Sequence, residues 1–293
     1  MLSIKLMAKV LCLGDSCVDI IIPYDKKDKS FFNCGGANSN SANILGKLGT
    51  NVAFIGKAGN DEYGIALKQN LIKNHVDVDN FILNDNMVTT QIRIELDENN
   101  DRHPYLYTKD NPSYLQIYKE DLDKIDLSET QYILTNGMML FQNPAAENIS
   151  DFLIKCHNKG IRILLDINYR VETINQDRKY LDKVISISDY LFGSIEDDFL
   201  PLTNTSNIDD AINKLLNNNV IIARNSKGST VYTSNQTYHY DSPHVEVVNT
   251  IGAGDAHNAG FIYGLVNDMN LEECNKQACL VAAEYISKKN RRY

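Results

Sequence analysis

Short apolar runs alternate with amphipathic stretches through the second half of the chain, and this alternation limits the possible folds more than any other feature. Apolar runs bounded by turn residues predict buried strands at 132–134, 161–167, 190–192 and 220–223. Apolar residues at helical spacing predict helices between and after these strands, at 144–158, 179–187, 208–217, 255–266 and 271–288. Repeated strand–helix units imply an α/β fold whose mainly parallel sheet is covered by helices on both faces, with ligands at the carboxyl ends of the strands.

The first half of the chain shows the same pattern with extra strands. The alternation continues through strands at 9–13 and 52–55 and helices at 38–48 and 63–74. Four β-like stretches do not fit it, at 18–22, 31–34, 89–96 and 103–108. The last two flank a polar turn and predict a hairpin, as do 228–233 and 237–240 further along the chain.

The size and composition of the chain narrow its class. Its 293 residues contain no obvious linker, internal repeat or low-complexity tract, so we expect one domain over residues 1–293. The net charge of −9 argues against nucleic acid or an anionic membrane as the main partner, and no apolar run is long enough to span a bilayer. The six cysteines include no C-x-x-C pair, which is typical of reduced thiols in a cytoplasmic protein.

A glycine loop that runs directly into a helix is the strongest chemical signal. Gly252, Ala253 and Gly254 let several backbone N–H groups approach a ligand, and the positive end of the following helix favours an anion. Asp255 would be repelled by bound phosphate, but it makes sense there if it takes a proton from a hydroxyl that attacks a phosphoryl group. The alternative is an ordinary glycine turn with an aspartate near a helix N-terminus, where aspartate is common.

This loop and two N-terminal motifs resemble the signatures of the ribokinase-like (PfkB) sugar kinase family. Residues 249–257 are similar to D-T-x-G-A-G-D-x-F, residues 35–49 to the family's glycine-rich N-terminal signature, and residues 56–64 to its G-x-x-G-x-D-x-x-G segment. The resemblance covers essentially the whole chain. It implies a three-layer α/β fold with a small β-sheet lid, whose strands are inserted at about 15–35 and 88–110.

The resemblance also implies the activity and its cofactors. Members of the family use ATP and Mg²⁺ to phosphorylate a hydroxyl group of a small sugar. A lid excludes water, which would compete with the sugar hydroxyl for the phosphoryl group. In the family the lid often dimerises, so we expect a homodimer through the lid here.

The substrate side of the site is assigned through the matching motif positions. Gly35 and Gly36 let the backbone approach a ligand, and the Asn40 amide offers a donor and an acceptor to vicinal sugar hydroxyls, unless this segment serves only to start a helix. The family places a substrate-binding aspartate at the position of Asp19. Asp15 is nearby and is the alternative, unless it lies in a surface turn.

Two basic residues are candidates for recognising an acidic group. Residues 166–170 resemble the family's D-x-N-x-R at a strand end, where Arg170 would contact a phosphate or an acidic sugar, unless it forms a structural ion pair. The hairpin that contains Lys109 loosely resembles the lid strand of fructokinases and 2-keto-3-deoxygluconate kinases, and a solvated surface charge is the alternative for Lys109. Asn168, within the D-x-N-x-R segment, is assigned to the cofactor side.

The nucleotide side is assigned by position, with departures from the family pattern. Glu196 matches the glutamate of N-x-x-E, which organises Mg²⁺ through water, although Gly193 replaces the asparagine. Asn225 replaces the first glycine of the G-x-x-G loop near the nucleotide, and asparagine tolerates a left-handed backbone better than most residues. The other candidates of this group are Lys227, Gly228, Asn258, Cys279 and Ala282. Lys227 has a solvated surface charge as its alternative.

Two further departures bear on a monovalent cation. Asn249 stands where the family has aspartate, and Ile251 stands where it has threonine or serine. In several relatives this region binds a monovalent cation that orders the anion loop. The loss of a carboxylate and a hydroxyl weakens such a site, so we expect K⁺ activation to be reduced or absent.

The sequence leaves three functions in comparison. We favour an unphosphorylated sugar or sugar acid as substrate, with a nucleoside as the closest competitor. A dinucleotide-dependent oxidoreductase is disfavoured because Gly252-x-Gly254 is followed by His257 and lies near the C-terminus. A non-catalytic sugar or nucleotide sensor on the same fold would explain the changed motif positions, but the presence of Asp255 argues against it.

Overall fold

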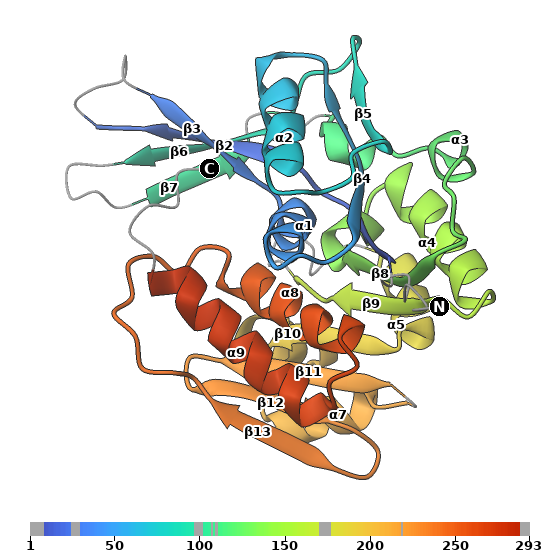
Figure 1. The fold of residues 1–293 in the computed structure, drawn as a ribbon, viewed down its shortest axis with the longest axis vertical. Helices are drawn as coiled ribbons and strands as arrows, with labels where there is room; N and C mark the ends of the chain where they lie inside the picture. Colours follow the sequence, from blue (N-terminus) through green and yellow to red (C-terminus); the bar gives the residue numbers. More distant parts are fainter. Residues whose placement is uncertain are drawn as a thin grey trace, which may run out of the picture.

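The computed structural model has the three-layer α/β architecture that the sequence predicts (Figure 1). It describes residues 9–24, 30–96, 102–106, 108, 111–169, 177–217 and 219–287. Nine strands form the central sheet in the order β13-β12-β11-β10-β9-β8-β1-β4-β5. Their bounds are β1 Lys9–Leu13, β4 Val52–Gly59, β5 Phe81–Asn84, β8 Thr130–Asn136, β9 Arg162–Asp166, β10 Tyr190–Ser194, β11 Val220–Asn225, β12 Gly228–Tyr232 and β13 Thr237–Asp241. In this order, all strands between β11 and β5 are parallel to their neighbours, whereas β12 pairs antiparallel with both β11 and β13.

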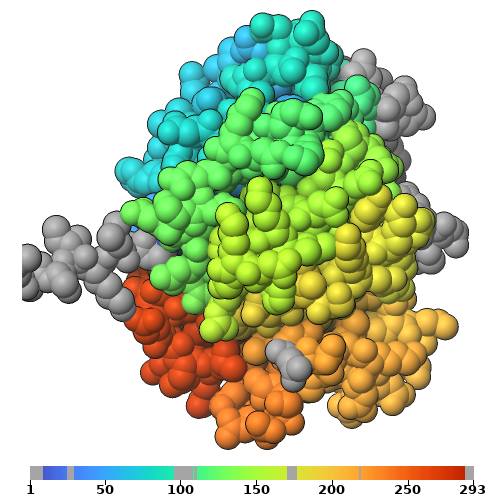
Figure 2. All heavy atoms as spheres, turned by 90° about the vertical axis from the view of Figure 1, so that its right-hand side faces the viewer, coloured from blue at the N-terminus to red at the C-terminus, as the bar shows by residue number. Residues whose placement is uncertain are grey.

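Helices cover both faces of this sheet because its strands are apolar on both sides. In β1, Val10 and Cys12 pack on one face, while Leu11 and Leu13 pack on the other. The first face carries α1 Ala37–Lys47, α2 Glu62–Lys73, α8 Ala253–Val266 and α9 Leu271–Ser287. The second face carries α3 Lys119–Leu122, α4 Ala145–His157, α5 Lys179–Ile187, α6 Leu200–Thr203 and α7 Ile208–Leu215. Figure 2 shows this second side, with the yellow-green and yellow segments of α4 and α5 over its middle.

A second, four-stranded sheet projects from the body of the molecule (Figure 1). Its order is β3-β2-β6-β7, with bounds β2 Cys17–Ile22, β3 Phe31–Gly35, β6 Gln91–Leu96 and β7 Arg102–Leu106. The pairs β2/β3 and β6/β7 are antiparallel hairpins, and β2 runs parallel to β6. The small sheet that was expected beside the main one is therefore confirmed.

The segment from residue 56 to residue 64 connects the two sheets. Asp61 caps α2 by accepting a hydrogen bond from the Gly64 amide at 2.9 Å. The same carboxylate accepts the Thr89 amide at 2.8 Å and the Thr89 hydroxyl at 2.6 Å, just before β6 begins. A Cβ atom at Gly64 would overlap the backbone oxygen of Gly59, so glycine is required there. This motif thus fixes the chain where it enters the small sheet.

The main difference from the predicted elements lies at β4 and β5. The sequence predicts a strand that ends at residue 55, but β4 continues through Gly56 to Gly59. Glycine suits position 56 of this strand because neighbouring groups approach the backbone closely there. A Cβ atom at Gly56 would lie 2.6 Å from the Phe54 ring. β5 has only four residues and was not predicted. Among the described residues, five short helical segments were not predicted either: η2 Ser113–Leu115, α3 Lys119–Leu122, η3 Gly137–Leu140, the π-helix η5 Ile195–Phe199 and α6 Leu200–Thr203.

None of the helices in the described ranges has the length and apolar character that crossing a bilayer requires.

Candidate functional site

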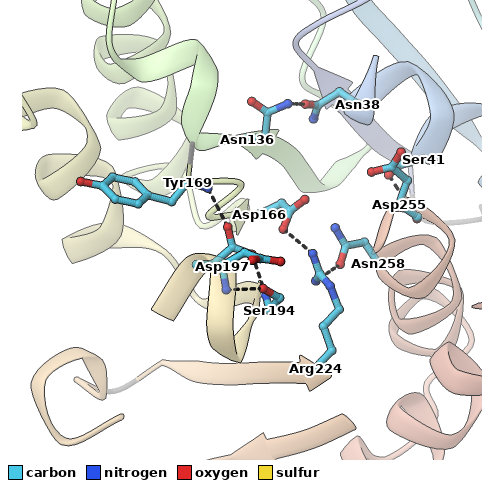
Figure 3. Close-up of polar contacts among 11 residues, drawn as sticks. Asn38, Ser41, Asn136, Asp166, Tyr169, Ser194, Asp197, Arg224, Asp255 and Asn258 are labelled. Atoms are coloured by element: carbon cyan, nitrogen blue, oxygen red, sulfur yellow. Dashed lines mark hydrogen bonds and ion pairs between the residues drawn. The ribbon is translucent and has the colours of Figure 1, made fainter. Parts of the chain in front are cut away.

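The candidate site lies at the carboxyl ends of the central strands, where α1 and α8 begin (Figure 3). α8 starts directly after the glycine loop, with Gly252 as its N-cap in the left-handed conformation at φ 76°. That conformation favours glycine. The amides of Gly254 and Asp255 belong to the first helical turn, where an α-helix leaves N–H groups without a partner inside the helix. The glycine turn and the helix start are therefore present, and the binding of an anion there stays a prediction.

Two residues of α1, in the N-terminal part of the chain, form hydrogen bonds with Asp255. Asn40 of α1 donates from Nδ2 to Oδ2 of Asp255 at 2.9 Å, and the Ser41 hydroxyl donates to the Asp255 backbone oxygen at 3.3 Å. Burial raises the pKa of Asp255 to about 7; the negative charges of Asp166 and Asp15 act in the same direction, while Asn40 and Arg224 oppose them. A carboxyl group with this pKa accepts and releases a proton near neutral pH.

The glycine pair before α1 brings that helix against the end of β1. Gly36 has φ 104°, and a Cβ atom there would lie 2.5 Å from the backbone oxygen of Asp15. The Asp15 carboxylate accepts the amides of Ala37 at 2.8 Å and Asn38 at 3.1 Å. It also accepts a hydrogen bond from Asn136 Nδ2 at 2.7 Å. Asp15 is thus a buried cap of α1 and does not lie in a surface turn.

Asp19 lies on β2, one face of which borders the glycine pair. A Cβ at Gly35 would lie 3.2 Å from the Asp19 carboxylate. Of the two aspartates considered as sugar ligands, Asp15 is occupied in capping α1. The assignment of Asp19 to the substrate stays a prediction.

A buried ion network that the sequence did not predict lies below the glycine loop (Figure 3). Arg224, near the end of β11, donates from Nη2 to Asp166 at 3.0 Å and from Nη1 to the Asn258 side-chain oxygen at 2.9 Å. Asp198 lies beside this pair and accepts the amides of Tyr169 and Ser194, each at 2.6 Å. Burial and the negative charge of Asp166 raise the pKa of Asp198. The one sequence signal was an arginine within the apolar run of β11.

The predicted metal residue lies on the same short helix as Asp198 of this network. Glu196 is exposed on η5, whereas Asp198 on the same segment is buried. Within the described ranges, no group of three or more histidine, cysteine, aspartate or glutamate side chains is arranged to hold a metal ion. In phosphoryl transfer, Mg²⁺ is usually held by one or two carboxylates together with water and substrate phosphates, so a sparse set of carboxylate oxygens fits this ion.

The loop assigned to the nucleotide forms by a different route from the one expected. Asn225 is not left-handed; it is the last residue of β11, and its side-chain oxygen accepts the amides of Lys227 at 2.9 Å and Gly228 at 3.2 Å. A side-chain hydrogen bond therefore replaces the backbone freedom of glycine in this turn. Gly228 adopts φ 155°, and Lys227 is exposed.

The remaining nucleotide candidates occupy different environments. Asn258 is buried in α8 and its observed partner is Arg224. Cys279 and Ala282 lie on α9, and the Cys279 thiol contacts the Tyr240 backbone oxygen of β13 at 3.9 Å. Asn168 follows β9 with φ 41°. Lys109 and Arg170 lie outside the described residues.

The segment before the anion loop is tied to the end of α9. Val248 donates its amide to the Ile286 backbone oxygen at 2.9 Å. The Asn249 side-chain oxygen accepts the Ile251 amide at 3.0 Å. The side chain that replaces the family's aspartate therefore takes part in a local turn.

Comparison with known proteins adds a family to this geometry. The model of the pfkB family carbohydrate kinases matches residues 7–293. The chain is 26% identical to 5-dehydro-2-deoxygluconokinase of Lacticaseibacillus casei, over 95% of this chain and 89% of the relative. It is 29% identical to aminoimidazole riboside kinase of Salmonella typhimurium, over 98% of this chain and 88% of the relative.

A solved structure shows the same fold. The crystal structure of aminoimidazole riboside kinase from Salmonella enterica, complexed with aminoimidazole riboside and an ATP analog, matches with a TM-score of 0.82 at 23% identity. The match covers 96% of this chain and 94% of that one.

Proposed function

Since the chain belongs to the pfkB family of carbohydrate kinases, we propose that it transfers the γ-phosphoryl group of ATP to a hydroxyl group of a small sugar or sugar acid. One observation carries this proposal. Asp255, with a pKa of about 7, stands at the start of α8 beside the amides of the glycine loop and is oriented by Asn40. A base and an anion cradle so close together suit phosphoryl transfer.

The proposed step moves one proton and one phosphoryl group. The acceptor hydroxyl gives its proton to the Asp255 carboxylate while its oxygen forms a bond to the γ-phosphorus. The bond between that phosphorus and the β–γ bridging oxygen breaks, and ADP leaves with the negative charge. The amides of Gly252, Gly254 and Asp255 stabilise the charge on the transferred group. Ala253 shapes the turn, because its amide donates to the Thr250 backbone oxygen at 3.0 Å. This arrangement requires the acceptor oxygen within hydrogen-bond reach of Asp255.

Mg²⁺ and ATP are the cofactors of this proposal. Bound Mg²⁺ would neutralise phosphate charge, and Glu196 would hold it through water, because carboxylate oxygen and water are its preferred ligands. Asn168, Asn225, Lys227, Gly228, Asn258, Cys279 and Ala282 are proposed for the nucleotide side by their positions. The turn of residues 225–228 joins β11 to β12 at the end of the sheet where the glycine loop lies. Helix α9, which carries Cys279 and Ala282, packs against β12 and β13.

The substrate side is proposed to consist of Asp19, Gly35, Gly36 and Asn40, with the small sheet as a lid that excludes water. The name of the Lacticaseibacillus casei relative denotes a sugar acid as acceptor, and that of the Salmonella relative denotes a riboside. We favour the sugar acid because Lys109 and Arg170 would supply cations for its carboxylate. A nucleoside or riboside is the second candidate.

The deciding experiment is ADP release with MgATP across ribose, fructose, 2-keto-3-deoxygluconate, 5-dehydro-2-deoxygluconate and a set of nucleosides. Asp255→Asn is the matched control, because it keeps the shape of the side chain and removes the base. We expect turnover on one acceptor class and its loss in Asp255→Asn. Binding of sugar or ATP without ADP release on any acceptor would contradict the kinase proposal and favour a sensor.

A further inference from the structure

The guanidinium of Arg224 packs directly against Gly254, the last residue of the glycine loop. A Cβ atom at Gly254 would lie 3.0 Å from Nη2 and 3.3 Å from Nε of Arg224. The Arg224 side chain is 15% exposed, and its two hydrogen bonds reach Asp166 at the end of β9 and Asn258 in the second turn of α8. One side chain thus joins the central sheet to the first turns of α8 (Figure 3).

The charge around Arg224 is mostly negative. Burial alone would lower the pKa of Arg224, but Asp166, Asp198 and Asp255 outweigh that effect and raise it. The guanidinium therefore stays charged. Without it, three neighbouring carboxyl groups would surround a loop that must receive a polyphosphate, and their field would oppose anion binding.

We propose that Arg224 is a positioning residue for phosphoryl transfer, which clamps the first turn of α8 to the end of β9 and supplies the fixed positive charge behind the amides of Gly254 and Asp255. The kinetic part of this inference rests on the proposed kinase activity. Its electrostatic part concerns Asp255 alone and holds whether or not a substrate has been found.

The groups that face Asp255 come from several elements. Asp15 after β1 and Asp166 of β9 bring negative charge, and Arg224 of β11 brings positive charge. Asp198 of η5 acts on Arg224. Cys17 on β2 also faces Asp255 and is neutral at pH 7, because burial and nearby carboxylates keep its pKa well above its ordinary value. His257 on α8 interacts with Arg224 and is neutral as well, because burial and the charge of Arg224 lower its pKa to about 3. Removing Arg224 should therefore raise the pKa of Asp255.

Arg224→Met tests both parts, with Arg178→Met as the matched control. Arg178 is partly exposed and bonds to Leu202 and Asp182, away from the glycine loop. We expect Arg224→Met to lower kcat about 100-fold, the size of effect seen when a single charge-stabilising group is lost. The acid limb of its pH–rate profile should move upward by roughly one pH unit. Arg224→Lys should restore the midpoint of the pH–rate profile, because lysine keeps the positive charge. It should recover only part of kcat, because lysine lacks the planar guanidinium that binds two partners at once.

Asp166→Asn gives a change of opposite sign and guards against misfolding of Arg224→Met. It leaves the arginine in place and removes a negative charge, so the pKa of Asp255 should fall. A purely structural role predicts no such opposite shifts. The inference is overturned if the midpoint of the pH–rate profile is unchanged in both Arg224→Met and Asp166→Asn. It is also overturned if kcat falls no more in Arg224→Met than in Arg178→Met.

A measurement without turnover separates this inference from the kinase proposal. The carboxyl carbon of Asp255 is followed by NMR in protein labelled with ¹³C-aspartate, and its signal is assigned by its loss in Asp255→Asn. A titration midpoint that rises in Arg224→Met and falls in Asp166→Asn supports the inference even if no acceptor is phosphorylated. Equal midpoints in the wild type and both variants would overturn it even in an active kinase.

Discussion

Asn40 Nδ2 lies 2.9 Å from Oδ2 of Asp255, although the two residues are 215 positions apart. This contact joins the start of α1 to the start of α8. It orients the proposed base and places the amide that is predicted to bind sugar next to it. Substrate binding and proton transfer are therefore predicted to share a hydrogen bond.

Asn40→Ala should weaken sugar binding and shift the pH dependence together. A lost hydrogen bond between a neutral amide and a sugar hydroxyl corresponds to about 0.5–1.5 kcal/mol, so the KM for sugar should rise roughly 2- to 10-fold. The Asn40 amide lowers the pKa of Asp255, so its removal should move the acid limb upward. Steady-state kinetics from pH 5 to 9 measure both effects. Asn213→Ala, at an exposed position on α7, is the control and should change neither.

Activity should fall as Asp255 becomes protonated. With a pKa of about 7, the base is increasingly neutral below that pH, and kcat/KM should drop about tenfold for each pH unit further down. The profile is measured in buffers of constant ionic strength. A flat profile between pH 5.5 and 7 would show that Asp255 is not the titrating base.

Asp255→Asn should abolish turnover and yet stabilise the protein at alkaline pH. The pKa of Asp255, raised from 3.8 to about 7, lies above its unfolded value. Its contribution to stability is complete below about pH 4 and is lost as the pH rises through 7. Asparagine does not ionise, so at pH 8 the variant should exceed the wild type in free energy of unfolding by about 1–3 kcal/mol. Urea titrations at pH 4 and pH 8 test this, and a difference of equal size at both values would contradict it.

Asp61→Ala should loosen the entry to the small sheet. The change removes the cap of α2 and both hydrogen bonds from Thr89, so we expect a loss of about 1–3 kcal/mol in the free energy of unfolding. If the small sheet is the lid, the KM for sugar should rise as well. Asp126→Ala removes only an exposed turn contact to Ser128 and serves as the control. If the Asp61→Ala variant is destabilised but its KM for sugar is unchanged, the contacts of Asp61 do not contribute to sugar binding through the small sheet.

K⁺ should have little effect on the wild-type enzyme. Asn249 carries no charge, and its oxygen already accepts the Ile251 amide. We expect kcat to change less than about twofold when K⁺ replaces Na⁺ at fixed ionic strength, since a neutral amide attracts a cation weakly. Asn249→Asp should increase the K⁺ response. A strong K⁺ dependence of the wild type would contradict the expectation.

Sequence patterns revealed the parts of the molecule that depend on local chemistry. Helix α5 begins and ends where apolar spacing predicted, and the cradle at Gly252 follows from the glycine and the helix start after it. The contact between Arg224 and Asp166 joins residues 58 positions apart, and no periodicity encodes it. The buried position of Asp198 depends on the π-helix η5, which also lacks a sequence signature. Local rules therefore located the glycine loop but not the charges that surround it.

The cap of α1 has a consequence for how the molecule folds. Its hydrogen-bond acceptor, Asp15, precedes Ala37 by 22 positions, and the hairpin β2–β3 lies between them. The N-terminus of α1 therefore gains its partner only when the chain between residues 15 and 37 has folded back on itself. A peptide that starts after residue 16 lacks the acceptor, and its helix should fray at residues 37 and 38. The helix that carries Asn40 thus depends at its N-terminus on a contact that is not local in the sequence.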